Sequence, residues 1–150
     1  MEIRQARDAD VPAMSATHKS VAEPEIDGAT ENATANAIDE QGRRLSNQRW
    51  VRSGVAHVAV LDGAVVGYAV LEHSFFERGF IAMLSVALSH RRRGVGAALV
   101  RHLEGLCTSE RIFTSTNRSN LIMQSLLQKL GDNYSGMVDN LDPEDPELFY

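Results

Sequence analysis

The sequence has 150 residues, of which 43% are hydrophobic and 23% charged, and its formal net charge is −5. A chain of this size and composition can bury its own core, so we expect a single domain over residues 1–150. The acidic balance excludes the broad basic field that draws a protein onto nucleic acid or an anionic membrane.

Short apolar, β-branched runs alternate with helical patterns along the chain. Asp62 and Gly63 separate two of the strand-like runs and are typical of a tight hairpin turn. In chain order we expect a strand at 3–6, a helix after the acidic residues 8–10, a loop at 21–34, a helix at 35–53, strands at 56–61, 65–71 and 80–86, a helix at 95–106, a strand at 112–116, a helix at 119–130 and a last strand at 148–150. This order predicts a mixed α/β domain.

The single cysteine, Cys107, excludes an intramolecular disulfide and a cysteine-cluster metal site. The five histidines show no metal-ligand spacing, so we expect no metal. Residues 1–5 lack the apolar stretch of a signal peptide, and no run approaches the roughly 18 apolar residues of a membrane span. We expect a cytoplasmic protein with no membrane partner.

Arginine and glycine concentrate at residues 91–96, which read Arg-Arg-Arg-Gly-Val-Gly between the expected strand 80–86 and helix 95–106. Glycines at a strand-to-helix turn let several backbone N–H groups point at one anion, with the positive end of the helix dipole behind them. Guanidinium groups add charge and paired hydrogen bonds to phosphate oxygens. This arginine-glycine loop therefore predicts a pyrophosphate site; a glycine turn with solvated arginines is the alternative. A nucleotide P-loop and a dinucleotide fingerprint do not fit, because Gly-Lys-Ser/Thr is absent and Leu99 replaces the third small residue.

With this loop the sequence resembles the GNAT superfamily of N-acetyltransferases, whose signature is Gln/Arg-x-x-Gly-x-Gly/Ala at the start of the helix after the central strand. The resemblance runs from about residue 56 to residue 131. It implies a central, mostly antiparallel twisted sheet with a splayed central strand pair, flanked by about four helices. It also implies acetyl-CoA as the co-substrate.

The resemblance assigns residues to the parts of acetyl-CoA. Residues 84–86 match the strand segment whose exposed backbone takes the pantetheine arm, and Val86 is the candidate for the amide that polarises the thioester carbonyl. The full set of expected cofactor-binding residues is Leu84, Ser85, Val86, Arg91, Arg92, Arg93, Gly94, Val95, Gly96, Ala97 and Asn120.

The sequence departs from the family pattern at the catalytic positions. Many family members place a tyrosine general acid four residues before the glycine that closes the second signature helix, where this chain has Leu127 before Gly131. Tyr134, from the next strand, is the candidate substitute, with a packed strand aromatic as the alternative. The expected strands at 80–86 and 112–116 contain no carboxylate, so we nominate Glu72, expected at the end of its strand, as the general base; a solvated strand end is the alternative.

These observations predict an N-acetyltransferase in which an amine, on a small molecule or a protein, attacks acetyl-CoA directly in a ternary complex. An acceptor of low pKa, such as an arylamine, would need the least help from a base. Phe75 and Phe76, if exposed, suit an acceptor pocket or a dimer contact, and burial in the core is the equal alternative. The acidic tail at 139–147 could favour a cationic substrate or form a plain solvated turn. Dimers occur in the family, so a homodimer is one expectation. A non-catalytic acyl-CoA-binding sensor of the same fold is the alternative function.

Overall fold

The computed structural model describes residues 1–22 and 40–150. Most of the expected loop at 21–34, and residues 35–39 of the expected helix, lie outside these ranges. The described elements are β1 (Glu2–Gln5), η1 (Asp8–Asp10), α1 (Val11–Ala22), α3 (Glu40–Arg52), β2 (Ala56–Leu61), β3 (Ala64–Phe75), β4 (Arg78–Val86), η2 (Leu88–His90), α4 (Val95–Leu106), β5 (Ile112–Asn117), α5 (Leu121–Leu130), β6 (Gly136–Val138) and β7 (Glu147–Phe149). None of the helices in the described ranges is long and apolar enough to cross a membrane.

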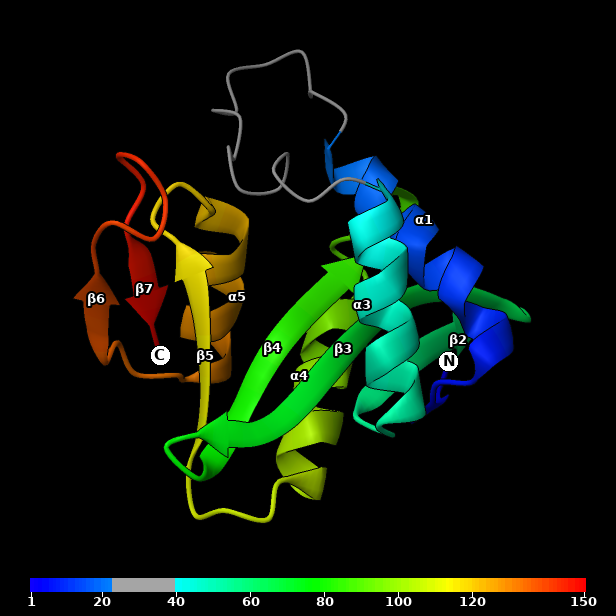
Figure 1. Ribbon diagram of the computed structural model, residues 1–150, viewed down its shortest axis with the longest axis horizontal. Coiled ribbons are helices and arrows are strands. Elements are labelled where there is room, and N and C mark those ends of the chain that lie inside the picture. The colour runs from blue at the N-terminus through cyan, green and yellow to red at the C-terminus, as the bar shows by residue number, and fades with distance from the viewer. Residues whose placement is uncertain (23–39) are drawn as a thin grey trace.

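The strands form one seven-stranded sheet in the order β1-β2-β3-β4-β5-β7-β6 (Figure 1). Every pair is antiparallel except β4–β5, which is parallel because α4 connects the two strands as a crossover. The described residues thus form the mixed, mostly antiparallel sheet and the four flanking α-helices that the sequence predicts.

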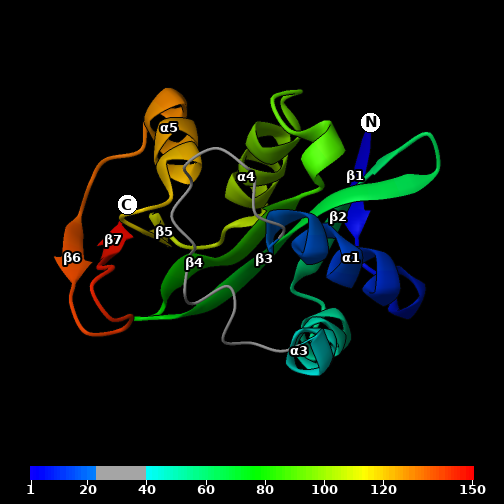
Figure 2. The same cartoon turned by 90° about the horizontal axis from the view of Figure 1, so that it is seen from above.

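Helices cover the sheet on both faces. Figure 2 shows α4 and α5 on one side of the sheet and α3 on the other. Strand alternation separates two cores along β3: Ala69 and Leu71 pack with α4, whereas Tyr68 and Val70 pack with α1 and α3. We call these sides the α4 face and the α1/α3 face.

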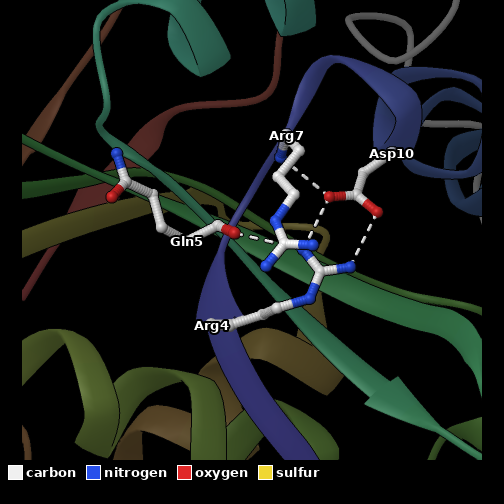
Figure 3. Close-up of polar contacts among 4 residues, drawn as sticks. All are labelled: Arg4, Gln5, Arg7 and Asp10. Atoms are coloured by element: carbon white, nitrogen blue, oxygen red, sulfur yellow. Dashed lines mark hydrogen bonds and ion pairs between the residues drawn. The ribbon is translucent and has the colours of Figure 1, made fainter.

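An ion pair fixes the start of the chain against α1 (Figure 3). The Arg4 guanidinium donates two hydrogen bonds to Asp10, with Nη1–Oδ2 and Nη2–Oδ1 distances of 2.7 and 3.0 Å. The backbone N–H of Arg7 donates to the same carboxylate at 2.8 Å. The hydrogen bond from Arg4 holds the pKa of Asp10 below its ordinary value despite the opposing effect of burial. The pair therefore ties β1 to the turn that begins α1.

The central strands separate after a short pairing. Among the described residues, β4 and β5 pair only at Gly79–Ile81 with Ile112–Thr114. Beyond Thr114, β5 continues with β7, at Ser115–Asn117. The register between β3 and β4 shifts at the same place, leaving Ala82 as an extra residue between Ile81 and Met83. A bulge bends its strand and ends regular pairing. This point of separation, which we call the fork, is the splayed strand pair that the resemblance implies.

Two strands differ from the sequence prediction. β3 extends to Phe75, which pairs with Arg78, so Glu72 lies within the strand and not at its end. The three-residue strand β6 was not predicted, and it joins the sheet only by pairing with β7. The extension of β3 arises from a tight turn at Phe76 and Glu77 that no glycine marks, and β6 forms through its pairing with β7, which its own three residues do not indicate.

Candidate active site

The arginine-glycine loop turns into α4 through two left-handed residues. Arg92 has φ = 59° and Gly94, the N-cap of α4, has φ = 80°. The first N–H with an intrahelical partner is that of Ala98, which donates to Gly94 O at 2.9 Å. The N–H groups of residues 95–97 therefore lie in the first turn of α4, before a carbonyl four residues back is available. Among the described residues, no heavy atom lies within 4 Å of where a Cβ of Gly94 would stand.

The residues of this loop fit a pyrophosphate. Arg92, Arg93 and Gly94 are exposed, so their backbone and guanidinium groups face solvent. Unpaired first-turn N–H groups, a helix N-terminus and adjacent arginines together bind phosphate oxygens strongly. The chain thus provides a group of donors for an anion at the start of α4.

Gly96 brings this group close to β4. A Cβ at Gly96 would lie 3.2 Å from Cδ2 of Leu126, 3.8 Å from Cγ2 of Val86 and 4.0 Å from Cδ2 of Leu84. The absence of a side chain lets the first turn of α4 pack between α5 and the end of β4. The anion-binding loop and the expected pantetheine segment are therefore neighbours.

The backbone N–H and C=O groups of Leu84 and Val86 point away from β3, toward the fork. Ala87 donates its N–H to Val66 O at 2.9 Å, which makes these two residues a hydrogen-bonded pair. In an antiparallel ladder the next pair, Gly67 with Val86, is then a non-hydrogen-bonded one, and its N–H and C=O groups point away from the partner strand. The same alternation turns the N–H and C=O of Leu84 away from β3. Arg91 uses one of these groups, because its Nε donates to Val86 O at 3.2 Å. The N–H groups of Leu84 and Val86 point to the side where β5 has separated.

The side chain of Ser85 points to the opposite face. It is buried, and its Oγ lies 3.0 Å from Oγ1 of Thr17 on α1. By the same alternation its backbone N–H and C=O face Tyr68 on β3, so Ser85 turns neither its side chain nor its backbone polar groups to the fork, and its contact with acetyl-CoA stays a prediction. Asn120 is the N-cap of α5, where its Oδ1 accepts the N–H of Met123 at 3.1 Å. This bond gives Asn120 a structural role in addition to the expected contact.

Three carboxylates of the acidic tail, none of them nominated individually from the sequence, lie beside β5 after it has separated from β4. Asp142 is buried and accepts a hydrogen bond of 2.7 Å from Asn117 Nδ2, and Asp145 accepts from the backbone N–H and Oγ of Ser119 at 3.0 and 2.6 Å. Glu147, on β7, is half-buried and accepts from the hydroxyl of Ser115. Burial raises the pKa of Glu147, and the charges of Asp142 and Asp145 raise it further.

A second polar network lies under α1 and α3. His18 Nε2 is 2.6 Å from the hydroxyl of Tyr68, a side chain with 0% exposure. Asn47 is bonded to the same hydroxyl and donates to Ser15 Oγ at 3.1 Å. Burial and the charge of Arg43 lower the pKa of His18 to about 4, and burial raises the pKa of Tyr68. His18 is thus a neutral imidazole in the folded protein at neutral pH.

A family model described as the acetyltransferase (GNAT) family matches residues 26–132. The chain belongs to the GNAT acetyltransferase family. Membership indicates acetyl transfer as the general activity and confirms the resemblance seen in the arginine-glycine loop. A comparison with curated protein sequences finds no match.

Solved GNAT structures share the fold. A GNAT acetyltransferase from Bacillus cereus is 24% identical, with a TM-score of 0.82, and the alignment covers 99% of this chain and 93% of that one. A ribosomal-protein-alanine N-acetyltransferase from Brucella melitensis is 23% identical, with a TM-score of 0.74 and coverage of 99% and 97%. The protein yncA from Salmonella typhimurium, solved with its cofactor acetyl-CoA, is 18% identical, with a TM-score of 0.71 and coverage of 99% and 91%.

The position of the GNAT tyrosine is closed in this chain. Leu127 is fully buried and lines a small pocket together with Ile81, Thr114 and Tyr150. Tyr134 lies in the irregular segment between α5 and β6, not in a strand, and is 59% exposed. Its ring packs edge-on against Tyr150, with 6.0 Å between centroids.

The two nominated catalytic residues lie on different parts of the domain. Glu72 is half-buried on β3, and its Oε1 accepts the indole N–H of Trp50 at 3.2 Å, which fixes the carboxylate against α3. Tyr134 follows α5 and packs near the end of β7. The structure therefore brings Gly96 next to Leu84 and Val86, whereas Glu72 and Tyr134 share no contact among those described. Within the described residues, no cluster of three or more His, Cys, Asp or Glu side chains could hold a metal ion.

Proposed function

We propose that the chain is an N-acetyltransferase that moves the acetyl group of acetyl-CoA to a primary amine by direct attack in a ternary complex. The observation that carries this proposal is the contact of Gly96 with Leu84 and Val86, which joins a pyrophosphate-binding loop to a strand edge with outward backbone groups. The bound acetyl-CoA of yncA, a protein of the same fold, supports the choice of co-substrate.

Each part of the site then has a task. The backbone N–H groups of residues 92–97 and the neighbouring guanidinium groups hold the pyrophosphate. The outward backbone groups of Leu84 and Val86 align the pantetheine arm along the fork. The Val86 N–H donates to the thioester oxygen and stabilises the charge that develops there during attack.

The acyl-CoA-binding sensor remains the second candidate, because Leu127 is fully buried where the family places its acid. Glu72 and Tyr134 remain the catalytic residues nominated from the sequence, and the bond of Glu72 to Trp50 favours a positioning role for it. We also propose that residues 1–150 act as one acetyl-CoA-binding domain in the cytoplasm. A homodimer stays a prediction.

The test is acetyl-CoA-dependent release of free thiol, measured with pooled amines and peptides, together with acetyl-CoA binding by calorimetry. Gly96→Asp should abolish both, because its side chain would start within 4.0 Å of Leu126, Val86 and Leu84, where a carboxylate would enter an apolar contact and push the first turn of α4 away from β4. Gly96→Ala adds volume without charge and should weaken binding less, since the side chain of Leu126 can move. Gly105→Asp makes the same change on an exposed part of α4 with open space around it, and should leave both readouts intact.

Release that requires an amine and disappears in Gly96→Asp supports the enzyme. Binding of acetyl-CoA without release in any pool supports the sensor. Unchanged binding in Gly96→Asp would overturn the assignment of the loop.

A further inference from the structure

All five phenylalanines of the sequence gather in one cluster. The ring centroid of Phe75 lies 5.1 Å from that of Phe76, 4.8 Å from Phe80, 5.5 Å from Phe113 and 5.7 Å from Phe149. Their residues come from β3, β4, β5 and β7 and from the turn after β3. Four strands thus contribute to one aromatic surface, which we call the phenylalanine cluster.

This cluster lies beside the fork and on the α1/α3 face. Phe80 and Phe113 are opposite each other in the parallel pairing of β4 with β5. The next pair, Ile81 with Thr114, is the last one before the two strands separate. Ile81 packs in the core with α4, so the preceding residue, Phe80, points to the other face. The cofactor loop, at the start of α4, therefore approaches the fork from one face and the phenylalanine cluster from the other.

Within the described residues, the cluster has one exposed edge. Phe76 is 84% exposed, and the other four phenylalanines are only half-buried. Exposed aromatic rings grouped in this way mark a surface that contacts a ligand or a partner. A small molecule on this surface would lie against the fork.

A carboxylate borders the cluster on the same face. Glu147 and Phe149 are two residues apart on β7, so both side chains point to one side of the sheet. Glu147 accepts the hydroxyl of Ser115, the residue that directly follows Thr114 at the fork. The register of β5 with β7 places Glu147 opposite Asn117 and Phe149 opposite Ser115, so Glu147 lies beside the part of β5 that follows its separation from β4. The charges of Asp142 and Asp145 act on its carboxylate.

We infer that the acceptor is a primary amine on a short linker from an aromatic ring, that the ring lies on the phenylalanine cluster, and that Glu147 accepts the proton of the attacking amine. This inference rests on the proposed function. The apolar surface selects the ring, and the carboxylates attract the ammonium, so the two ends of the ligand match the two parts of the site.

Two protons leave the amine nitrogen during the transfer, one before the attack and one after it. The ammonium first loses one proton to water, and the neutral amine nitrogen then attacks the thioester carbon. A C–N bond forms, the C–S bond breaks and CoA leaves as a thiolate, which takes a proton from water. The second amine proton passes to Glu147 and from there to solvent. Burial and neighbouring charge raise the pKa of Glu147, which makes it a better proton acceptor than an exposed glutamate.

The experiment compares kcat and KM for 2-phenylethylamine, ethylamine, aniline and a lysine peptide, in the full chain with saturating acetyl-CoA. We expect a KM for 2-phenylethylamine roughly tenfold or more below that for ethylamine. Phe149→Leu should raise the KM for 2-phenylethylamine and leave that for ethylamine unchanged. Glu147→Gln should lower kcat by a factor on the order of 10² and remove the acidic limb of the pH profile.

Two controls keep folding and binding apart from chemistry. Glu110→Gln removes an exposed carboxylate on the connection from α4 to β5 and should leave kcat unchanged. Acetyl-CoA affinity and the urea midpoint should match wild type in every variant. Glu147→Gln retains an oxygen that can accept the Ser115 hydroxyl, so its fold should persist.

The outcomes separate the two proposals. Equal kcat/KM for ethylamine, the peptide and 2-phenylethylamine would overturn the inference and leave the proposed function standing. A wild-type pH profile in Glu147→Gln would overturn the role of Glu147. Acetyl-CoA binding with no turnover on any amine would overturn the proposed function and this inference with it.

Discussion

The buried imidazole of His18 makes the stability of this domain depend on pH in a calculable way. The folded-state pKa of His18 is about 4, against an ordinary value of 6.5. Between these values the unfolded chain binds a proton at His18 that the folded chain does not. Because the folded pKa is the lower one, stability is full above pH 6.5 and falls as the pH drops toward 4. At about 1.36 kcal/mol per pH unit and proton, the loss attributable to His18 is about 3 kcal/mol.

Urea unfolding followed by circular dichroism between pH 7.5 and 4.5 measures this loss. His18→Gln should reduce the slope of the unfolding free energy against pH by the equivalent of most of one proton, because glutamine does not titrate. The glutamine side chain can still accept the Tyr68 hydroxyl. His90→Gln removes an imidazole from the η2 turn and should keep the wild-type slope. His57, whose pKa is lowered by burial and by His102, contributes in the same direction in all three proteins and cancels in the comparison. Equal slopes in wild type and His18→Gln would refute the reasoning.

Three other substitutions test the framework around the site. Asp10→Asn should lower the free energy of unfolding at pH 7 by about 2 kcal/mol. The pKa of Asp10 is lowered in the folded protein, so the difference should shrink as the pH falls below the ordinary value of 3.8 and vanish as the pH passes the lowered one; urea titrations at pH 7 and across this range check this. Gly67→Ala places a Cβ 2.9 Å from the backbone oxygen of Ser85, so it should destabilise the domain by about 1–3 kcal/mol. The resulting shift of β4 should also weaken acetyl-CoA binding, and wild-type affinity would show that residues 84–86 do not hold the cofactor. Leu127→Tyr should cost a similar amount without raising thiol release, because the leucine is fully buried; a faster, equally stable variant would show that this position reaches the thioester.

Local patterns predicted the elements that local chemistry determines. The hairpin at Asp62-Gly63, the amphipathic α4 and the glycine stop of α5 at Gly131 all occur where the sequence places them. Each depends on side-chain periodicity or on a glycine with positive φ, and both are visible in a short window. The arginine-glycine loop belongs to the same class.

The turn after β3 shows what a window misses. Phe76 and Glu77 adopt φ values of 49° and 60° although neither is glycine, so the turn has no glycine at its centre to reveal it. As a result β3 was predicted too short and Glu72 was placed at a strand end. The expected fork came only from the family resemblance, because no local rule predicts that β5 exchanges β4 for β7 after Thr114.

Glu147 was noticed only as part of an acidic tail. Its position depends on the register that pairs Asn117 with Glu147 and Ser115 with Phe149 across thirty or more residues of chain. Such pairings are decided by packing on both faces of a sheet and not by composition. The five acidic residues within 139–147 indicate a boundary before an apolar strand, but not which side of the sheet their carboxylates face.

The position of β7 between β5 and β6 also determines an order of events in time. β6 precedes β7 in the chain but contacts the sheet through it, so β6 cannot dock until β7 has paired with β5. One side of the fork consists of β2, β3 and β4, which can form early because they are joined by hairpins. The other side, made by β5, β7 and β6, is completed only when β7 pairs with β5. Opening of β7 would release β6 with it, and the two strands would exchange their amide hydrogens as one unit.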